Sequence, residues 1–183
     1  MNFEIILVKT GELNSDQQSA LTQLNRECFG DVPPAEITDN FFAEPFVYLF
    51  AIANKEIISR VALFKRTIQF DGQDIIVGGI GGVCVATSHR HHGIASSMVK
   101  RALVVLRGEL CDVACLNVDL AKPAYHLYEK LGFTMMSRDI SFENVKGELV
   151  REGGTMFIPL ASPDKYQLLM TSSKTFHYGR GYW

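Results

Sequence analysis

A change of hydrophobic period near residue 87 limits the fold of this chain more than any other feature. Before it, apolar runs at 46–53, 57–70 and 73–86 are typical of strands, and Asp71-Gly72 between the last two indicates a tight hairpin. After it, apolar residues over 93–107 recur at helical spacing, and an apolar run at 111–118 indicates a buried strand. An antiparallel meander therefore leads into a strand–helix–strand unit.

The rest of the chain extends this pattern. Further strands are predicted at 3–8, 133–144 and 155–161. Helices are predicted from Ser15, with Gln18 at capping-box spacing, and from Pro123, a residue favoured in a first turn. We expect one α/β (α+β) domain over 1–183. Its central sheet is expected to be mixed and mostly antiparallel, with one parallel strand pair and helices on both faces.

Composition excludes several classes of protein. The net charge of −2 disfavours general electrostatic binding to nucleic acid. No apolar run approaches the roughly 18 residues of a membrane span, and the N-terminal residues lack a signal-peptide pattern, so we expect a cytoplasmic protein. The four cysteines match no zinc spacing, and we expect reduced core thiols at Cys28, Cys84, Cys111 and Cys115.

The turn between the strand at 73–86 and the helix at 93–107 predicts an anion site. First-turn amides of a helix lack internal partners and carry the positive end of its dipole. Gly93 lets the backbone approach a ligand, Arg90 can fork onto phosphate oxygens, and Ser96 can add a hydroxyl. On these residues alone, an ordinary strand–helix connection with a capping glycine is an equal alternative. No metal is expected at the neighbouring histidines, since no further ligand lies at zinc spacing.

Two motifs make this turn more specific. The segment VCVATSHRHHGIASSMVKRAL resembles the acetyl-CoA-binding segment of the GNAT superfamily of N-acetyltransferases. That family's Arg/Gln-x-x-Gly-x-Gly/Ala signature is matched by Arg90, Gly93 and Ala95. A second family signature, Ala-x-x-Leu-Tyr-x-x-x-Gly-Phe, is matched by Ala124, Leu127, Tyr128, Gly132 and Phe133. The resemblance covers about residues 47–160 and implies acetyl transfer from acetyl-CoA to an amine.

The resemblance also implies where coenzyme A binds. Its pyrophosphate would lie on the backbone of Arg90, His91, His92, Gly93, Ile94, Ala95 and Ser96. Its pantetheine arm would run beside Val83, Cys84 and Val85, where a backbone N–H would polarise the thioester carbonyl. The glycine-rich run GGIGG suits a bulge that lets a second chain approach. Within this strand Cys84 is interpreted as a core thiol, because no histidine is placed to activate it as a nucleophile.

Tyr128 matches the family's general acid. A phenol with a pKa of about 10 stays protonated at neutral pH and can protonate a leaving thiolate whose pKa is about 8.5. The spacing of apolar residues alone favours a core tyrosine on an amphipathic helix. The catalytic interpretation of Tyr128 rests on the family motif.

A narrower resemblance concerns the acceptor side. The order of strands, motifs and a final tryptophan is similar to the aminoglycoside 2′-N-acetyltransferases. Gly81, beside Gly82, stands where those enzymes have a glutamate, and Gly181 replaces an aspartate near the end. Asp119, at the tip of the strand after Asn117, is therefore the candidate base, with a cap before the next helix as an equal alternative.

Four further acceptor contacts are predicted. Gly82 and Asn117 would line the acceptor site, and Asp39, in the acidic segment 31–44, could face a cationic substrate. The aromatic tail 175–183 would bring Trp183 and its carboxylate to the site, with a tail that only covers apolar surface as the alternative.

The predicted partner is a small-molecule amine, with no nucleic acid and no membrane, and a homodimer is left open. A protein or peptide acceptor is the alternative within the enzyme class. A coenzyme-A-binding module without turnover is the alternative outside it.

Overall fold

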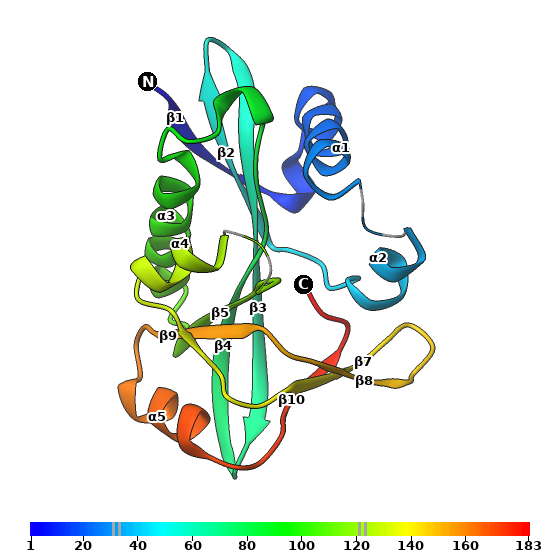
Figure 1. Cartoon of the computed structure of the whole chain (residues 1–183), viewed down its shortest axis with the longest axis vertical. Coiled ribbons are helices and arrows are strands. Elements are labelled where there is room, and N and C mark those ends of the chain that lie inside the picture. The colour runs from blue at the N-terminus through cyan, green and yellow to red at the C-terminus, as the bar shows by residue number, and fades with distance from the viewer. Residues whose placement is uncertain (31, 33, 121, 123) are drawn as a thin grey trace.

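A seven-stranded sheet runs through the centre of the molecule in the computed structural model (Figure 1), which describes every residue except 31, 33, 121 and 123. In order across the sheet, the strands are β1 (Glu4–Lys9), β2 (Val47–Ala53), β3 (Glu56–Phe70), β4 (Gln73–Val85), β5 (Val113–Asn117), β9 (Thr155–Pro159) and β6 (Thr134–Met135). Only β4 and β5 pair in parallel within this sheet. The predicted fold class is therefore confirmed.

The hairpin between β3 and β4 has the predicted turn. Asp71 and Gly72 have φ values of 50° and 78°, the left-handed conformation that a two-residue hairpin loop requires. Further along, the register shifts between Arg60 and Ala62, opposite Gly82, whose φ is 54°. The extra residue makes a bulge in β4, as the glycine-rich run predicted.

A second, three-stranded sheet was not predicted. It orders β10 (Phe176–Arg180), β7 (Ile140–Glu143) and β8 (Leu149–Glu152), with β10 and β7 parallel. The single strand predicted over 133–144 is wrong, because the chain leaves β6 on the central sheet and crosses to β7 on the second one. Arg138 lies at this crossing, where its guanidinium donates to the carbonyls of Lys174 and Leu169 at 2.7 and 2.8 Å.

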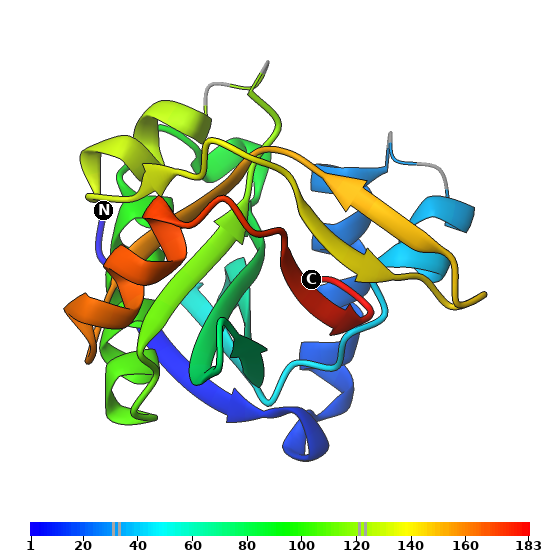
Figure 2. The same ribbon diagram turned by 90° about the horizontal axis from the view of Figure 1, so that it is seen from below.

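The helices cover both faces of the central sheet. They are α1 (Ser15–Phe29), α2 (Pro34–Asn40), α3 (Ile94–Gly108), α4 (Ala124–Lys130) and α5 (Pro163–Thr171), with short 3-10 turns at Thr10–Glu12 and Thr87–His89. Figures 1 and 2 show α1 and α3 on opposite sides of the sheet. No helix in the described part of the chain is long and apolar enough to cross a membrane.

The helix α1 begins at Ser15 as predicted, but its capping box lies one residue earlier than expected. Asn14 caps the helix: its side chain accepts from Gln17 N–H at 2.9 Å, and the Gln17 side chain accepts from Asn14 N–H at 3.0 Å. This capping box replaces the one expected from Ser15 and Gln18, because asparagine is as good a cap as serine and stands one position earlier. Pro123, the predicted start of the other helix, lies outside the described residues.

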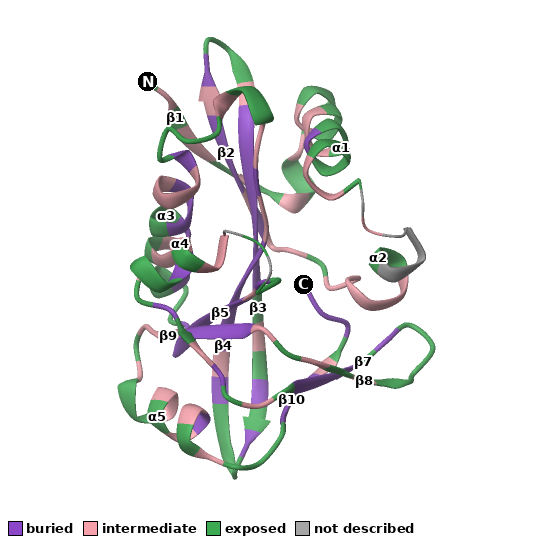
Figure 3. Ribbon diagram, in the orientation of Figure 1, coloured by how far each residue is buried: buried purple, intermediate pink, exposed green. Residues whose placement is uncertain are grey.

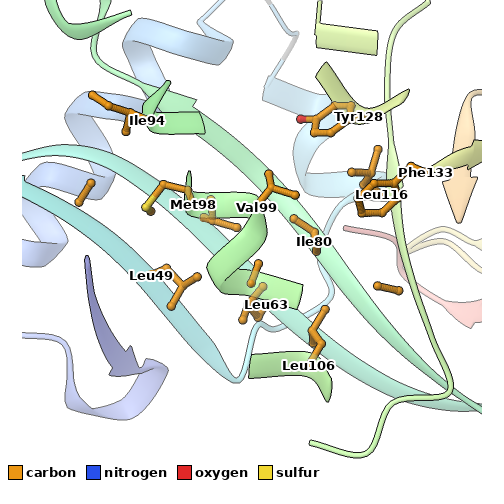
Figure 4. Packing of buried hydrophobic residues seen from close by; sticks show 14 of the residues in the cluster. Leu49, Leu63, Ile80, Ile94, Met98, Val99, Leu106, Leu116, Tyr128 and Phe133 are labelled. Carbon is orange, nitrogen blue, oxygen red and sulfur yellow. The ribbon is translucent and has the colours of Figure 1, made fainter. Parts of the chain in front are cut away.

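Two apolar clusters hold the layers together. Between the sheet and α3, Leu49, Leu63, Ile80, Met98, Val99 and Leu106 are packed together (Figure 4). On the opposite face, the cluster is largely aromatic and includes Phe64, Phe142, Phe157, Phe176, Tyr178 and Tyr182. Figure 3 shows that buried residues are concentrated in the strands, whereas turns and outer helix faces are exposed. Burying each large side chain stabilises the fold by about 1.5–3 kcal/mol.

The aromatic tail is part of this second cluster. Tyr178 and Tyr182 are fully buried. Arg66 on β3 donates to three tail carbonyls, those of Tyr178, Arg180 and Gly181, at 2.5, 2.9 and 3.0 Å. These bonds satisfy main-chain oxygens of β10 and of the residue after it, so the tail is held against β3 of the central sheet.

The prediction of four free thiols is wrong for one pair. Cys28 on α1 and Cys84 on β4 form a disulfide across a sequence separation of 56 residues. The folded chain packs the last turn of α1 against the end of β4, and this contact could not be read from cysteine spacing. Cys111 and Cys115 are free and buried, as expected.

Candidate active site

A cleft opens where β4 and β5 diverge. The two strands pair only through Val77–Gly79 and Val113–Cys115, so the rest of β4 has no strand partner on that side among the described residues. The cleft has a volume of about 780 Å³. It is lined by Cys28, Phe29, Ile80–Val85, His89, Arg90, His91, Gly93–Ser96, Leu116–Asp119, Lys122, Ala124, Leu127, Tyr128 and Trp183.

The start of α3 forms one end of the cleft. His91 and Gly93 have φ values of 66° and 75°, and this left-handed backbone turns the chain into the helix at Ile94. The amides of the first helical turn lack partners within the helix and lie at the positive end of its dipole. Ile94, Ala95 and Ser96 all line the cleft, so the predicted anion site opens into it.

The side chains of this turn mainly shape the loop. Arg90 donates from Nε to the Val85 carbonyl at 3.1 Å and from Nη2 to the Cys28 sulfur at 3.7 Å, which ties the loop to the end of β4 and to α1. The His92 ring lies 2.8 Å from the Arg90 carbonyl, and His92 does not line the cleft. Among the described residues, no three His, Cys, Asp or Glu side chains come together as a metal site would require.

The free edge of β4 provides backbone groups along the middle of the cleft. Val83, Cys84 and Val85 all line it. The Cys84 side chain points away into the disulfide with α1, and its carbonyl accepts from the Ser59 hydroxyl at 2.6 Å. The exposed edge can therefore present main-chain donors and acceptors to an extended ligand, while the side chains on this stretch serve packing.

Tyr128 on α4 reaches the cleft from the other wall. Its ring packs edge-on against Phe133, with centroids 6.1 Å apart, and the hydroxyl points away from that contact (Figure 4). The side chain is 7% exposed, and burial raises the pKa of Tyr128 to about 12. The phenol is therefore fully protonated at neutral pH and can act only as a proton donor there.

Polar residues gather at the end of β5. Asn117 and Asp119 both line the cleft, and the Asp119 carbonyl accepts from Lys122 N–H at 2.9 Å. This bond closes a turn after the strand, so the carboxylate is carried by a bend at the mouth of the cleft. The geometry brings Asp119 and Tyr128 to the same cavity from different elements.

Trp183 forms part of the cleft wall beside Gly81. Its ring stacks on Phe64, with centroids 5.4 Å apart, and lies 5.4 Å from the Arg66 guanidinium. A Cβ on Gly81 would come within 2.9 Å of the Phe64 ring and 3.4 Å of the Trp183 backbone carbon. The space that a larger residue at 81 would need is thus occupied by two aromatic residues, and a carboxylate there would have to displace them.

Asp39 lies elsewhere. Its carboxylate forms an ion pair with Lys146 at 2.9 Å, and its carbonyl accepts from Val145 N–H at 2.8 Å. It is not among the residues that line the cleft. The structure therefore brings together the predicted residues of the turn, β4, β5, α4 and the tail, but not His92 or Asp39.

Several cleft residues were missed by sequence reasoning. Cys28 and Phe29 come from the last turn of α1, Leu116 comes from β5, and Val118 follows that strand. No local pattern identifies them, because α1 reaches the cleft only through its packing against β4. Lys122 lies just before the second motif and could have been included on that basis.

A parallel strand pair that splays beside a helix N-terminus, with a tyrosine on the following helix, is the arrangement that the sequence resemblance predicts for a transferase that binds acyl-coenzyme A. Residues 10–136 match the acetyltransferase (GNAT) domain family. The match covers more than half of the chain, which therefore belongs to the GNAT acetyltransferases, enzymes that use acetyl-CoA.

The names of known proteins similar to this chain indicate different acceptors. N-alpha-acetyltransferase 30 of Saccharomyces cerevisiae is 37% identical over 62 residues, which cover 33% of this chain and 35% of that protein. The ribosomal-protein-S18-alanine N-acetyltransferase of Escherichia coli has a TM-score of 0.60 and 15% identity, covering 88% of this chain and 97% of the other. An aminoglycoside acetyltransferase from an uncultured soil metagenomic sample has a TM-score of 0.57 and 22% identity, covering 72% and 91%. These structural similarities show the fold.

Proposed function

We propose that this acetyltransferase moves the acetyl group of acetyl-CoA to a primary amine of a small molecule, by direct attack in a ternary complex. The observation that carries the choice of a small acceptor is the anchored tail. Arg66 holds the tail by its carbonyls, and Trp183 forms part of the cleft wall. A peptide acceptor would need an open groove on this side, which the packed aromatic residues narrow.

Each predicted role uses a group that lines the cleft. Acetyl-CoA supplies the activated acetyl group. The amides at the start of α3 would hold its pyrophosphate, and a backbone N–H at Val83 or Val85 would stabilise negative charge on the carbonyl oxygen. Asp119 would accept a proton from the acceptor amine, and Tyr128 would give its hydroxyl proton to the leaving sulfur.

The proposal is tested by measuring thiol release from acetyl-CoA with amino acids, polyamines, aminoglycosides and short peptides as acceptors. We expect turnover with a small amine and none with peptides under the same conditions. Turnover with peptides alone would support the alternative of a protein or peptide acceptor, which the names of two similar proteins indicate for those proteins. Tight coenzyme binding with no turnover for any amine would support the binding module.

A further inference from the structure

A buried arginine without an acidic partner lies behind the α1 side of the cleft. Arg60 on β3 is 9% exposed. Its Nη2 donates to the Asn25 amide oxygen of α1, and its Cζ lies 5.5 Å from the centre of the Phe29 ring. Both of these partners are neutral. In the part of the chain that the structure describes, no carboxylate forms an ion pair with Arg60, and its Nε has no hydrogen-bond partner.

This arrangement is costly for the free protein. A buried cation loses its hydration, and the loss is usually offset by a paired anion and a full set of hydrogen bonds. Burial lowers the pKa of Arg60 to about 10, which reports the same penalty. The stacking on Phe29 and the bond to Asn25 offset only part of it, so an anion brought to this place would be bound strongly.

Arg60 is not among the residues that line the cleft, but its guanidinium lies directly against residues that do. Gly82, in the bulge of β4, lines the cleft, and a Cβ on Gly82 would collide with Nη1 of Arg60. Nη1 therefore occupies the side-chain position of a cleft residue, next to Val83, where the thioester carbonyl is expected. Phe29, which stacks on the guanidinium, also lines the cleft.

The charges of the lining residues are mixed. Among the described lining side chains, Asp119 is the one carboxylate, and Arg90 and Lys122 are cationic. The carboxyl carbon of Trp183 lies beside Gly81, so a second acidic group belongs to this part of the cleft. Arg60, on the α1 side, is the cation that could balance an anionic group of the acceptor.

We propose that Arg60 binds a carboxylate of the acceptor, so that the substrate is an amine carrying a carboxylate a few bonds from its nitrogen, with an apolar α-amino acid as the simplest case. The inference rests on the proposed function and specifies its substrate class. Nη1, which lies against Gly82, would donate a charge-assisted hydrogen bond to the carboxylate. A free carboxylate also distinguishes this acceptor from a protein N-terminus, where an amide stands at that position.

The test compares matched acceptors. L-Phenylalanine and L-leucine are assayed against L-phenylalaninamide and L-leucinamide, and kcat/KM is measured for each with the wild type, Arg60→Gln, Arg60→Lys and Asn25→Ala. The amino acid and its amide differ in amine basicity. The decisive quantity is therefore the ratio of kcat/KM for the acid to kcat/KM for the amide, compared between the wild type and each variant at one pH. We expect the ratio to fall at least about tenfold in Arg60→Gln and less in Arg60→Lys. It should stay within about threefold in Asn25→Ala, which loosens the same contact with α1 but keeps the charge.

Two results would overturn the proposal. One is an unchanged ratio in folded Arg60→Gln and Arg60→Lys, which would make Arg60 a structural support for α1. The other is a wild type that acetylates other amines but neither amino acid. If no amine is acetylated at all, the proposed function fails instead. The role of Arg60 is then tested separately by the binding of L-phenylalanine in the presence of coenzyme A. Binding is monitored by the fluorescence of Trp183, the chain's single tryptophan. The proposal also fails if the wild type shows no fluorescence change, or if Arg60→Gln shows the same change as the wild type.

Discussion

The indole of Trp183 lies directly against the backbone of Gly79, the last residue of β4 that pairs with β5. A Cβ at position 79 would collide with the indole ring. The tail thus reaches the central sheet at the point where the two strands separate, and the absence of a side chain at Gly79 is what allows this contact.

We expect Gly79→Ala to displace Trp183. Overpacking of this kind costs about 1–3 kcal/mol, and the acceptor KM should rise because a wall of the cleft moves. Denaturant unfolding and steady-state kinetics measure the two effects. Gly108→Ala, at the end of α3 where nothing lies within 4 Å of an added Cβ, is the matched control; it should leave the acceptor KM unchanged and raise stability by up to about 1 kcal/mol. Equal behaviour of the two variants would show that the indole is not held at Gly79.

Tyr128→Phe is expected to lower kcat by about 10²–10⁴, because the leaving thiolate loses its proton donor. The ring and its contact with Phe133 remain, so thermal stability should change little. Tyr125→Phe is the control, since that exposed hydroxyl on the same helix bonds to Glu129 at 2.5 Å. An unchanged kcat in Tyr128→Phe, under conditions where chemistry limits the rate, would remove Tyr128 from the mechanism.

Reduction of the Cys28–Cys84 disulfide should destabilise the fold. Closing a loop of 56 residues restricts the unfolded chain, which is worth about 4 kcal/mol in the chain-entropy model. We expect the midpoint of thermal unfolding to fall when dithiothreitol is added to the wild type. The double variant Cys28→Ala, Cys84→Ala should unfold at one temperature with or without reductant. A wild type insensitive to dithiothreitol, with both thiols shown to be reduced, would contradict this expectation.

Stability should decrease in alkali. Burial raises the pKa of Tyr128 to about 12 from 10.0, that of Cys115 to about 12 from 9.0 and that of Cys111 to about 11 from 9.0. Each group binds its proton more tightly in the folded state, so its contribution is complete below the unfolded pKa and is lost as pH rises through the folded value. Between its unfolded and folded pKa values, each group can lower the free energy of unfolding by up to about 1.4 kcal/mol per pH unit.

The measurement is the free energy of unfolding at pH 7, 9 and 10.5 with the disulfide intact. We expect little change between pH 7 and the start of thiol titration, and a steepening fall above pH 9. Cys111→Ala should reduce the slope between its two pKa values, once its own cavity cost is subtracted at pH 7. A flat profile up to pH 10.5 would show that these groups are solvated in the native state.

Local sequence patterns predicted the structure correctly where a feature is formed by neighbouring residues in the chain. The Asp71-Gly72 turn, the bulge at Gly82 and the helix beginning after Gly93 follow from backbone preferences of the residues themselves. The same holds for Tyr128 in its motif, since a helix places the tyrosine at a set distance from Gly132. Predictions failed where a segment's partner lies far away in sequence, as with the strand at 133–144, which is divided between two sheets.

The sequence by itself determined the order of the elements from β2 to α4 and the positions of the turn before α3 and of Tyr128, because hydrophobic period and turn chemistry act over a few residues. Only the tertiary structure decided that Cys28 joins Cys84, that Phe64 and Trp183 fill the space at Gly81, and that Arg60 lies behind Gly82. Each of these contacts joins residues more than 15 positions apart, and its existence depends on how whole strands and helices pack. The cleft residues before α3 are thus recognisable from local motifs, whereas those around Gly81 and Gly82 are brought together by packing.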